Sequence, residues 1–152
     1  SKYVFNYLLS LTNNAEIAEE LMQETFYSAI KNIHKFQNNS SLKTWLYKIA
    51  KNKLIDYCKK NKKIKEIDID KVDVKFLITN SLDESYEDRD ELINLYKKIH
   101  RLDEKSNEVI YLRVKCEFNF REIGNIMGKS EEWTRITFYR AKIKLKEELK
   151  NE

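Results

Sequence analysis

The chain has 152 residues, of which 36% are charged, with only two glycines and no proline. Because tight hairpins and β-bulges depend on such turn residues, this composition excludes a β-sandwich or barrel, and the 41% of apolar residues excludes full disorder. No run approaches the roughly 20 apolar residues of a membrane span, no export signal opens the chain and the two cysteines lack zinc-ligand spacing, so a cytoplasmic, all-helical protein is predicted.

The net charge of +4 is distributed in blocks. Residues 15–30 carry four glutamates and no base, whereas residues 31–63 carry ten lysines and one aspartate. Residues 64–104 carry twelve acids against seven bases, and residues 129–150 carry seven bases against four acids. Two basic blocks separated by an acidic one are typical of a protein that contacts polyanions at two places, although solvated faces produce similar runs.

Apolar spacing predicts the helices of the N-terminal part. An apolar cluster over 2–11 indicates a first helix, and residues 17–33 predict a second one. The polar segment 37–41 interrupts this pattern, and Ser40 or Ser41 is placed to cap a third helix. The expected inward side chains of the second helix are Ile17, Ala18, Leu21, Met22, Phe26, Ala29, Ile30 and Ile33. Those of the third helix are Leu42, Trp45, Leu46, Ile49, Leu54 and Tyr57.

Helical periodicity is lost from about residue 62 to residue 89, where the stretch IKEIDIDKVDVKF alternates apolar and polar residues. A lone strand has no partner in this chain, so the segment is predicted to be an extended, acidic linker. Helical spacing resumes near Leu92. The predicted fold class is therefore all-α, with two small helical domains over 1–61 and 90–152 joined by a flexible linker over 62–89.

The C-terminal part contains a helix-turn-helix pattern. A short helix over 120–127 is followed by Gly128, where a helix end requires the left-handed conformation that glycine adopts readily. Ser130 is then placed to cap a long helix that extends to about Lys150. The apolar face of the short helix consists of Phe120, Ile123, Ile126 and Met127.

A helical wheel divides the long C-terminal helix into two faces. The face expected in the core contains Phe138, Ala141, Leu145 and Leu149. The opposite, outward face contains Arg135, Ile136, Tyr139, Arg140 and Ile143. Apolar side chains beside arginines on an outward face need a partner to cover them. The major groove of DNA offers thymine methyls and guanine edges to such a face, and a protein surface is the alternative partner.

The loop over 36–41 and the lysine-rich helix after it carry groups that suit single-stranded nucleic acid. Amide and hydroxyl groups hydrogen-bond an unstacked base, aromatic rings stack on it, and lysines follow the phosphates. The aromatic residues available for stacking are Phe36, Trp45, Tyr47 and Tyr57. The spacing of Trp45 with Leu42 and Ile49 favours a place in the core instead.

Nothing in the sequence indicates an enzyme. It has no glycine-rich phosphate loop, no metal-ligand spacing and no nucleophile–base set, so neither catalysis nor a cofactor is predicted. His34 and His100 are isolated and are interpreted as structural or solvated residues.

Three segments, in this order, resemble the extracytoplasmic-function (ECF) group of bacterial sigma-70 family initiation factors. They are AEIAEELMQETFYSAIKNIHKF, SSLKTWLYKIAKNKLIDYCKK and LDEKSNEVIYLRVKCEFNFREIGNIMGKSEEWTRITFYRAKIKLKEEL. The resemblance implies a sigma-2-like and a sigma-4-like domain, binding to core RNA polymerase, recognition of the promoter −35 duplex and melting of the −10 element. By analogy it also implies an anti-sigma partner. The protein is expected to be a monomer when it is free of partners and not to insert into the membrane itself.

The family motifs imply three sets of contacts. The set that would bind the β′ clamp helices of polymerase is Glu20, Gln23, Glu24 and Phe26. The set that would bind the −10 element is Phe36, Asn38, Asn39, Ser40, Ser41, Lys43, Trp45, Lys48, Asn52 and Lys53. The set that would bind the −35 duplex is Ser130, Trp133, Arg135, Ile136, Tyr139 and Arg140.

The chain departs from the family pattern at two informative places. Leu102, Asp103 and Glu104 stand where the family has Leu-Pro-Glu, so the expected rigid turn is absent. Thr137 replaces the usual arginine, which removes a phosphate contact. Two other functions stay open: a helix-turn-helix regulator that binds its duplex without polymerase, and a helical adaptor whose basic faces are merely solvated.

Overall fold

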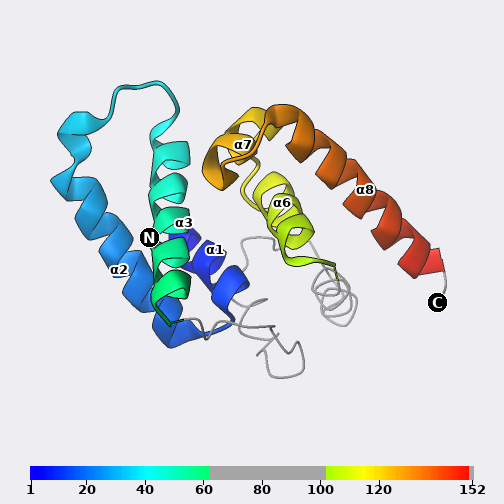
Figure 1. Cartoon of the computed structure of the whole chain (residues 1–152), viewed down its shortest axis with the longest axis horizontal. Helices are drawn as coiled ribbons and strands as arrows, with labels where there is room; N and C mark the ends of the chain where they lie inside the picture. The colour runs from blue at the N-terminus through cyan, green and yellow to red at the C-terminus, as the bar shows by residue number, and fades with distance from the viewer. Residues whose placement is uncertain (62–101, 151–152) are drawn as a thin grey trace.

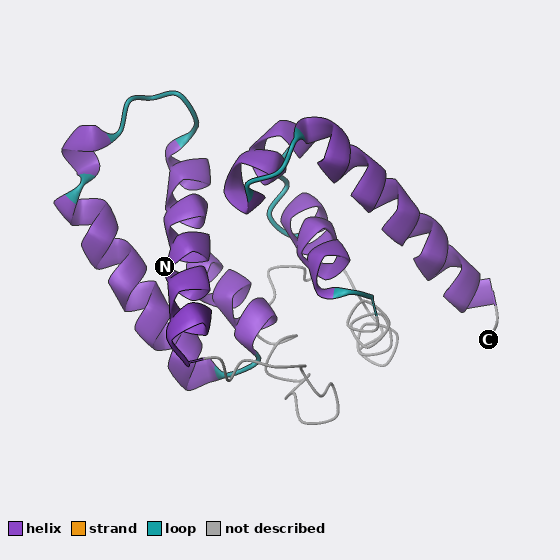
Figure 2. Ribbon diagram, in the orientation of Figure 1, coloured by secondary structure: helices purple, strands orange, loops and turns teal. Residues whose placement is uncertain are grey.

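The computed structural model describes residues 1–61 and 102–150, and every regular element within these ranges is helical (Figures 1 and 2). This confirms the predicted all-α class. The predicted linker over 62–89 and the helical spacing from Leu92 lie outside the described residues. None of the described helices is long and apolar enough to cross a membrane.

The N-terminal half packs its helices into a bundle. Helix α1 (Lys2–Thr12) is followed by α2 (Ala15–Lys31), the short 3-10 helix η1 (Ile33–Lys35) and α3 (Leu42–Asn61). Each of the three α-helices contacts the other two. In Figure 1, α2 and α3 run side by side and diverge toward the loop that joins them. The bundle therefore presents this loop at one end.

Side-chain caps begin the second and third helices. The Oδ1 atom of Asn14 accepts hydrogen bonds from the backbone N–H groups of Glu16 and Ile17 at 3.0 and 3.1 Å. The hydroxyl of Ser41 accepts from the backbone N–H of Thr44 at 3.1 Å. Of the two serines predicted as caps of α3, Ser41 therefore performs this role.

The C-terminal half consists of α6 (Glu104–Val114), α7 (Phe120–Met127) and α8 (Glu131–Lys150). Helix α8 packs against both α6 and α7. A small cluster between α6 and α8 is formed by Leu102, Ile110 and Ala141, with Phe138 and Leu145 packed against it. The α7–turn–α8 unit matches the predicted helix-turn-helix.

The glycine turn and the Ser130 cap predicted for the helix-turn-helix are confirmed, and a further cap begins α7. Asn119 and Glu122 form a capping box at the start of α7, with hydrogen bonds of 2.8 and 3.0 Å between each side chain and the other's backbone N–H. Gly128 ends α7 with a φ of 69°, in the left-handed region. The hydroxyl of Ser130 accepts from the backbone N–H of Trp133 at 3.0 Å, which caps α8.

The two halves share one hydrophobic core, which the sequence did not predict. Tyr47 of α3 is buried, and its ring centroid lies 5.1 Å from that of Tyr7 and 5.0 Å from that of Phe118. Buried residues of α1 to α3, α6 and α7 belong to the same cluster. Helices α6 and α7 therefore lie against α1 and α3, as Figure 1 shows.

Some predicted inward positions are wrong. Ile30 is 74% exposed and Ile33 is 52% exposed, because the end of α2 and η1 diverge from α3 (Figure 1). Leu42 is 49% exposed in the first turn of α3. Tyr47, considered for base stacking, is 2% exposed because α3 has a second buried face, turned toward α6 and α7.

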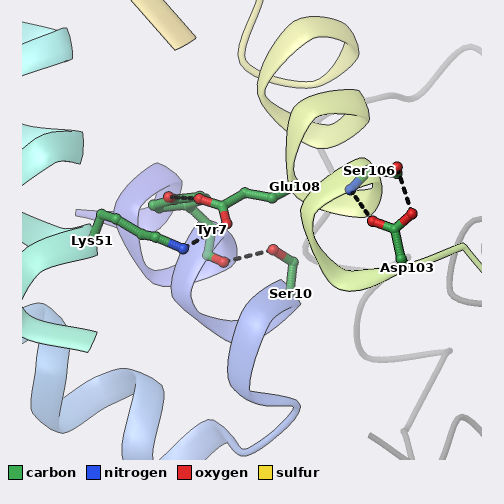
Figure 3. Close-up of polar contacts among 6 residues, drawn as sticks. All are labelled: Tyr7, Ser10, Lys51, Asp103, Ser106 and Glu108. Atoms are coloured by element: carbon green, nitrogen blue, oxygen red, sulfur yellow. Dashed lines mark hydrogen bonds and ion pairs between the residues drawn. The ribbon is translucent and has the colours of Figure 1, made fainter. Parts of the chain in front are cut away.

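Asp103 caps α6 in place of the family's proline turn. Its Oδ1 accepts the Ser106 backbone N–H at 2.8 Å and its Oδ2 accepts the Ser106 hydroxyl at 2.9 Å (Figure 3). Partial burial opposes ionisation of this carboxyl group. The hydrogen bonds from Ser106 outweigh that effect and hold the pKa of Asp103 below its ordinary value.

We expect Asp103→Ala to lower the free energy of unfolding by about 1 kcal/mol at neutral pH, because the cap is lost. Because the pKa of Asp103 is lower in the folded than in the unfolded state, its ionised form stabilises the fold. This stabilisation is complete above about pH 4 and is lost as the pH falls through the folded-state pKa. The difference between wild type and variant in urea unfolding should therefore shrink on acidification. A difference that stays constant would contradict a role for the charge.

Candidate nucleic-acid and polymerase interfaces

The outward face of α8 is exposed as the helical wheel predicts. Ile136, Tyr139 and Ile143 are 41%, 50% and 59% exposed, and Arg140 is exposed beside them. On the opposite side Ala141 is buried, whereas Leu149 has a side chain outside the described part of the structure. The long helix thus offers a mixed apolar and cationic surface.

Arg135 is oriented at the start of this face. Its Nη2 lies 3.3 Å from Oε1 of Glu131 one turn earlier, and its Cζ lies 5.8 Å from the ring centroid of Phe120. Because Arg135 and Glu131 are each about half exposed, the ion pair contributes little stability. The ring of Phe120 also contacts Tyr139, with centroids 6.1 Å apart. Phe120 therefore supports both outward side chains from beneath.

The remaining two residues of the −35 set have structural contacts. Ser130 is exposed but uses its hydroxyl to cap α8. Trp133 is half-buried against the core, and the ammonium group of Lys129 lies 5.3 Å from its ring centroid. These contacts fix the turn before the outward face, and DNA contact by Ser130 and Trp133 stays a prediction.

The loop before α3 combines an aromatic pair with amide groups. Phe36 and Trp45 are half-buried and contact each other, with ring centroids 5.2 Å apart and planes inclined by 42°. Asn38 is exposed with a φ of 58°, a left-handed conformation that asparagine tolerates. The exposed Asn39 donates its amide to Oε1 of Gln37 at 3.3 Å. Amide groups therefore lie in the loop that leads to this aromatic pair.

Two lysines of the −10 set contact the C-terminal half. The Nζ atom of Lys43 donates to the backbone oxygen of Cys116 at 2.7 Å and lies 4.8 Å from the ring centroid of Phe118. The Nζ atom of Lys48 donates to Oδ1 of Asn125 at 3.0 Å. The structure therefore divides the predicted −10 residues between the loop end of the bundle and the side of α3 that contacts the C-terminal half, where Lys43 and Lys48 both stay exposed.

The other members of the −10 set lie at the surface or near it. Ser40 is half-buried and donates its hydroxyl to the backbone oxygen of Ser41 at 3.3 Å. Asn52 is exposed on α3, whereas Lys53 is half-buried. The structure thus brings the loop residues and the start of α3 together and leaves Asn52 and Lys53 further along the helix.

The sequence pattern did not reveal the most buried charged contact. Glu108 of α6 is 2% exposed, and its two oxygens accept from Nζ of Lys51 and the hydroxyl of Tyr7, each at 2.6 Å (Figure 3). Burial first, and then the neighbouring carboxylate, raises the pKa of Tyr7, so the hydroxyl stays a neutral donor. The available sequence signal for this contact was the position of Glu108, one turn before Leu112 on the apolar face of α6.

The acidic face of α2 is exposed around the predicted polymerase contacts. Phe26 differs, since it is half-buried and packs against the core. The neighbouring Tyr27 and Ile30 are 69% and 74% exposed, which adds apolar surface to this face. An exposed patch that mixes apolar and acidic groups is suited to a protein partner. The exposed acidic and amide residues are Glu20, Gln23 and Glu24.

Within the described ranges, no group of histidine, cysteine or acidic residues could hold a metal ion. Cys58 and Cys116 are free thiols, half-buried and buried respectively. His34 is exposed, and His100 lies outside the described residues.

Comparison with known proteins defines the class. The family model Sigma-70 region 2 matches residues 1–64, and Sigma-70, region 4 matches residues 99–147. The RNA polymerase sigma factor YlaC of Bacillus subtilis (strain 168) is 30% identical over 147 residues, which cover 96% of this chain and 85% of YlaC. The ECF RNA polymerase sigma factor SigM of the same strain is 32% identical over 143 residues, which cover 94% of this chain and 86% of SigM.

The chain belongs to the ECF group of sigma-70 family RNA polymerase sigma factors. Its fold is similar to that of the sigma factor RpoE in complex with the anti-sigma factor NepR from Bartonella quintana. The TM-score is 0.72 at 22% identity, covering 97% of this chain and 90% of that chain. The resemblance drawn from the sequence motifs is thus confirmed, and a polymerase-independent regulator is not favoured.

Gly124 determines how closely α7 approaches the turn before α8. A Cβ atom at this position would lie 2.6 Å from the backbone oxygen of Lys129. We therefore expect Gly124→Ala to lower the free energy of unfolding by about 1–3 kcal/mol, despite the better helix propensity of alanine. Urea unfolding measures this change, with the exposed α7 variant Arg121→Ala as control. Stabilisation of the Gly124→Ala variant would contradict the steric account.

Proposed function

We propose that this sigma factor directs core RNA polymerase to promoters by binding two DNA elements with separate surfaces, over 1–61 and 90–152, joined by a linker over 62–89. The observation that carries the proposal is the exposed face of α8, where Ile136 and Tyr139 lie beside two arginines with no covering partner within the described residues. The chain contributes binding and positioning, and the polymerase performs the chemistry.

The −35 duplex would be bound by α8 in the major groove. Arg135 and Arg140 would donate to guanine edges or phosphates, and Ile136 and Tyr139 would contact thymine methyls. A good bidentate base contact discriminates by about 1–3 kcal/mol. Phe120 supports this assignment because its ring contacts Tyr139 and lies beneath Arg135.

The −10 element would be captured as an opened strand at the loop over 36–41. Extruding a base costs a few kcal/mol, and stacking on an aromatic side chain returns about 1–3 kcal/mol. These terms nearly cancel, so the loop would capture a strand that polymerase contacts help to open. The half-buried pair of Phe36 and Trp45 beside exposed amide groups supports this role.

The acidic face of α2 would bind the β′ clamp helices of polymerase. Glu20, Gln23 and Glu24 are exposed there, with Tyr27 and Ile30 as apolar neighbours. Clustered carboxylates repel one another, so a basic partner surface would relieve the electrostatic repulsion present in the free chain. Phe26 would act through packing, since it is half-buried.

We propose further that the chain acts in the cytoplasm, is a monomer when free and is held by an anti-sigma protein. The similar sigma factor RpoE forms such a complex, with the anti-sigma factor NepR. An anti-sigma protein would cover the exposed α2 and α8 surfaces. That partner, when anchored, would also hold the chain at a membrane.

The proposed function predicts promoter-dependent run-off transcription when the full chain is added to core polymerase. Substitution of Glu20 and Glu24 by lysine should abolish transcription and co-purification with core enzyme, while the far-ultraviolet circular dichroism spectrum stays unchanged. Lys105→Glu, on an exposed position of α6, controls for a charge reversal away from this face. Absence of transcription by the wild-type chain on any promoter selected from its genome would refute the function.

For the −35 surface, we expect Arg135→Ala to weaken the free energy of DNA binding by about 1–3 kcal/mol. This loss should depend on the base pair at one position when Arg135 makes a bidentate base contact. Affinities of holoenzyme for duplexes with single substitutions measure this cost, with Lys105→Ala as control. An equal loss on every sequence would assign Arg135 to phosphate contact instead.

A further inference from the structure

The exposed face of α8 combines three kinds of side chain within its first three turns. Glu132 and Ile136 are exposed one helical turn apart, so their side chains are neighbours, and Tyr139 follows on the same face. Arg135 and Arg140 are exposed along its borders. In a helix-turn-helix, the N-terminal part of the second helix contacts base edges in the major groove. Glu132 and Ile136 therefore lie where α8 is expected to meet a base edge.

Glu132 lacks the partner that its neighbour Glu131 has. Oε1 of Glu131 lies 3.3 Å from Nη2 of Arg135. Glu132 is exposed, and no residue within the described ranges donates a hydrogen bond to it or forms an ion pair with it. Ile136, one turn further along, is 41% exposed. The two positions thus offer one free carboxylate acceptor beside one free aliphatic side chain.

Of the pyrimidines cytosine, 5-methylcytosine, thymine and uracil, one matches both groups. In the major groove cytosine presents its N4 amino group, a donor, whereas thymine presents the O4 acceptor and the C5-methyl group. A carboxylate accepts from N4 and is repelled by O4, and an aliphatic side chain gains from burying the methyl group. 5-Methylcytosine carries the amino donor on C4 and the methyl group on the adjacent C5. Cytosine satisfies only the carboxylate, and thymine satisfies only the aliphatic side chain.

We propose that Glu132 and Ile136 read 5-methylcytosine in duplex DNA. The carboxylate of Glu132 accepts from the N4 amino group, and the side chain of Ile136 packs on the C5-methyl group. This inference rests on the proposed binding of duplex DNA by α8, and it names a modified base that this face prefers at one position. Methylation of a single cytosine then strengthens a binding site without changing its sequence.

Aromatic packing beneath the face keeps it in a fixed orientation. The ring centroid of Tyr139 lies 6.1 Å from that of Phe120 on α7 and 5.4 Å from that of Phe138. Cζ of Arg135 lies 5.8 Å from the centroid of Phe120. These contacts hold α8 in one rotation about its axis, so the exposed side chains are presented to the groove without further ordering of the backbone. A preorganised face suits discrimination between bases that differ by one methyl group.

The test measures binding of holoenzyme, formed from the full chain and core polymerase, to promoter duplexes. Each −35 pyrimidine in turn is cytosine, 5-methylcytosine, thymine or uracil. At one position we expect 5-methylcytosine to bind about fourfold more tightly than cytosine, which is the effect of burying one methyl group. It should bind at least about fivefold more tightly than thymine, which lacks the amino donor. Uracil, which lacks both groups, should bind most weakly.

Two variants and two matched controls assign the contacts. Ile136→Ser should abolish the preference for 5-methylcytosine over cytosine, whereas Ile143→Ser should retain it. Ile143 is 59% exposed on the same face but lies past the part of α8 that meets base edges. Glu132→Ala should abolish the preference over thymine, whereas Glu147→Ala, at an exposed position near the end of α8, should retain it. All four side chains are exposed, so circular dichroism should report an unchanged fold.

Equal affinity of the wild-type holoenzyme for cytosine and 5-methylcytosine at every −35 position would overturn the inference. A preference that survives Ile136→Ser would overturn it as well, because the methyl group would then act through the shape of the DNA. A preference over cytosine without a preference over thymine would remove Glu132 from the site.

A second measurement, without polymerase, separates this inference from the proposed function. The full chain is titrated at low salt with a pool of random duplexes made with either cytosine or 5-methylcytosine throughout. The methylated pool should bind more tightly, by up to about fourfold, and the difference should be smaller for Ile136→Ser than for Ile143→Ser. This result alongside a failure of promoter binding by holoenzyme would refute the sigma function and leave the methyl readout intact. Equal binding of the two pools would contradict the inference and would favour a protein as the partner of this face.

Discussion

Glu108 carries a charge at a place where water has almost no access, and taking a carboxylate out of water is expensive. The cost is offset because Lys51 and the Tyr7 hydroxyl each donate to one of its oxygens. Both donors lie in the N-terminal half, so these two hydrogen bonds exist only while α6 remains against α1 and α3. The shared core around Tyr47 depends on the same approach of the two halves.

The packing of the two halves against each other is an intramolecular association. The covalent connection between the halves raises the effective concentration of α6 and α7 around α3, so modest contacts suffice to hold them together. The ion pair of Glu108 with Lys51 and the contacts of Lys43 and Lys48 are polar, whereas the core around Tyr47 is apolar. Under the proposed function, polymerase would bind the α2 face and duplex DNA would bind α8, and both surfaces stay exposed while the two halves are packed together.

Short-range features of the fold could be predicted from the sequence. Gly128 and the caps Asn119 and Ser130 act within a few residues of themselves, and the helical wheel placed Tyr139 on the exposed face because α8 packs on one side only. Asp103 took over the helix start where the family has proline, which the departure from the motif did not reveal.

Long-range packing could not be predicted in the same way. Tyr47 is buried by Phe118 and Cys116, which lie about 70 positions further along the chain, and no local period signals such a contact. For the same reason the sequence did not indicate that Lys43 and Lys48 donate to acceptors in the C-terminal half. It also placed Ile30 in the core, although the helices diverge around it.

The most direct measurement is the distance between spin labels at Ile55→Cys on α3 and Arg121→Cys on α7, in a chain whose Cys58 is replaced by serine and whose Cys116 is replaced by alanine. The account predicts one short distance in the free chain and a longer or broader distribution in the Glu108→Lys variant, which lacks the buried carboxylate. A distance that is long in the free chain, or that Glu108→Lys leaves unchanged, would contradict it.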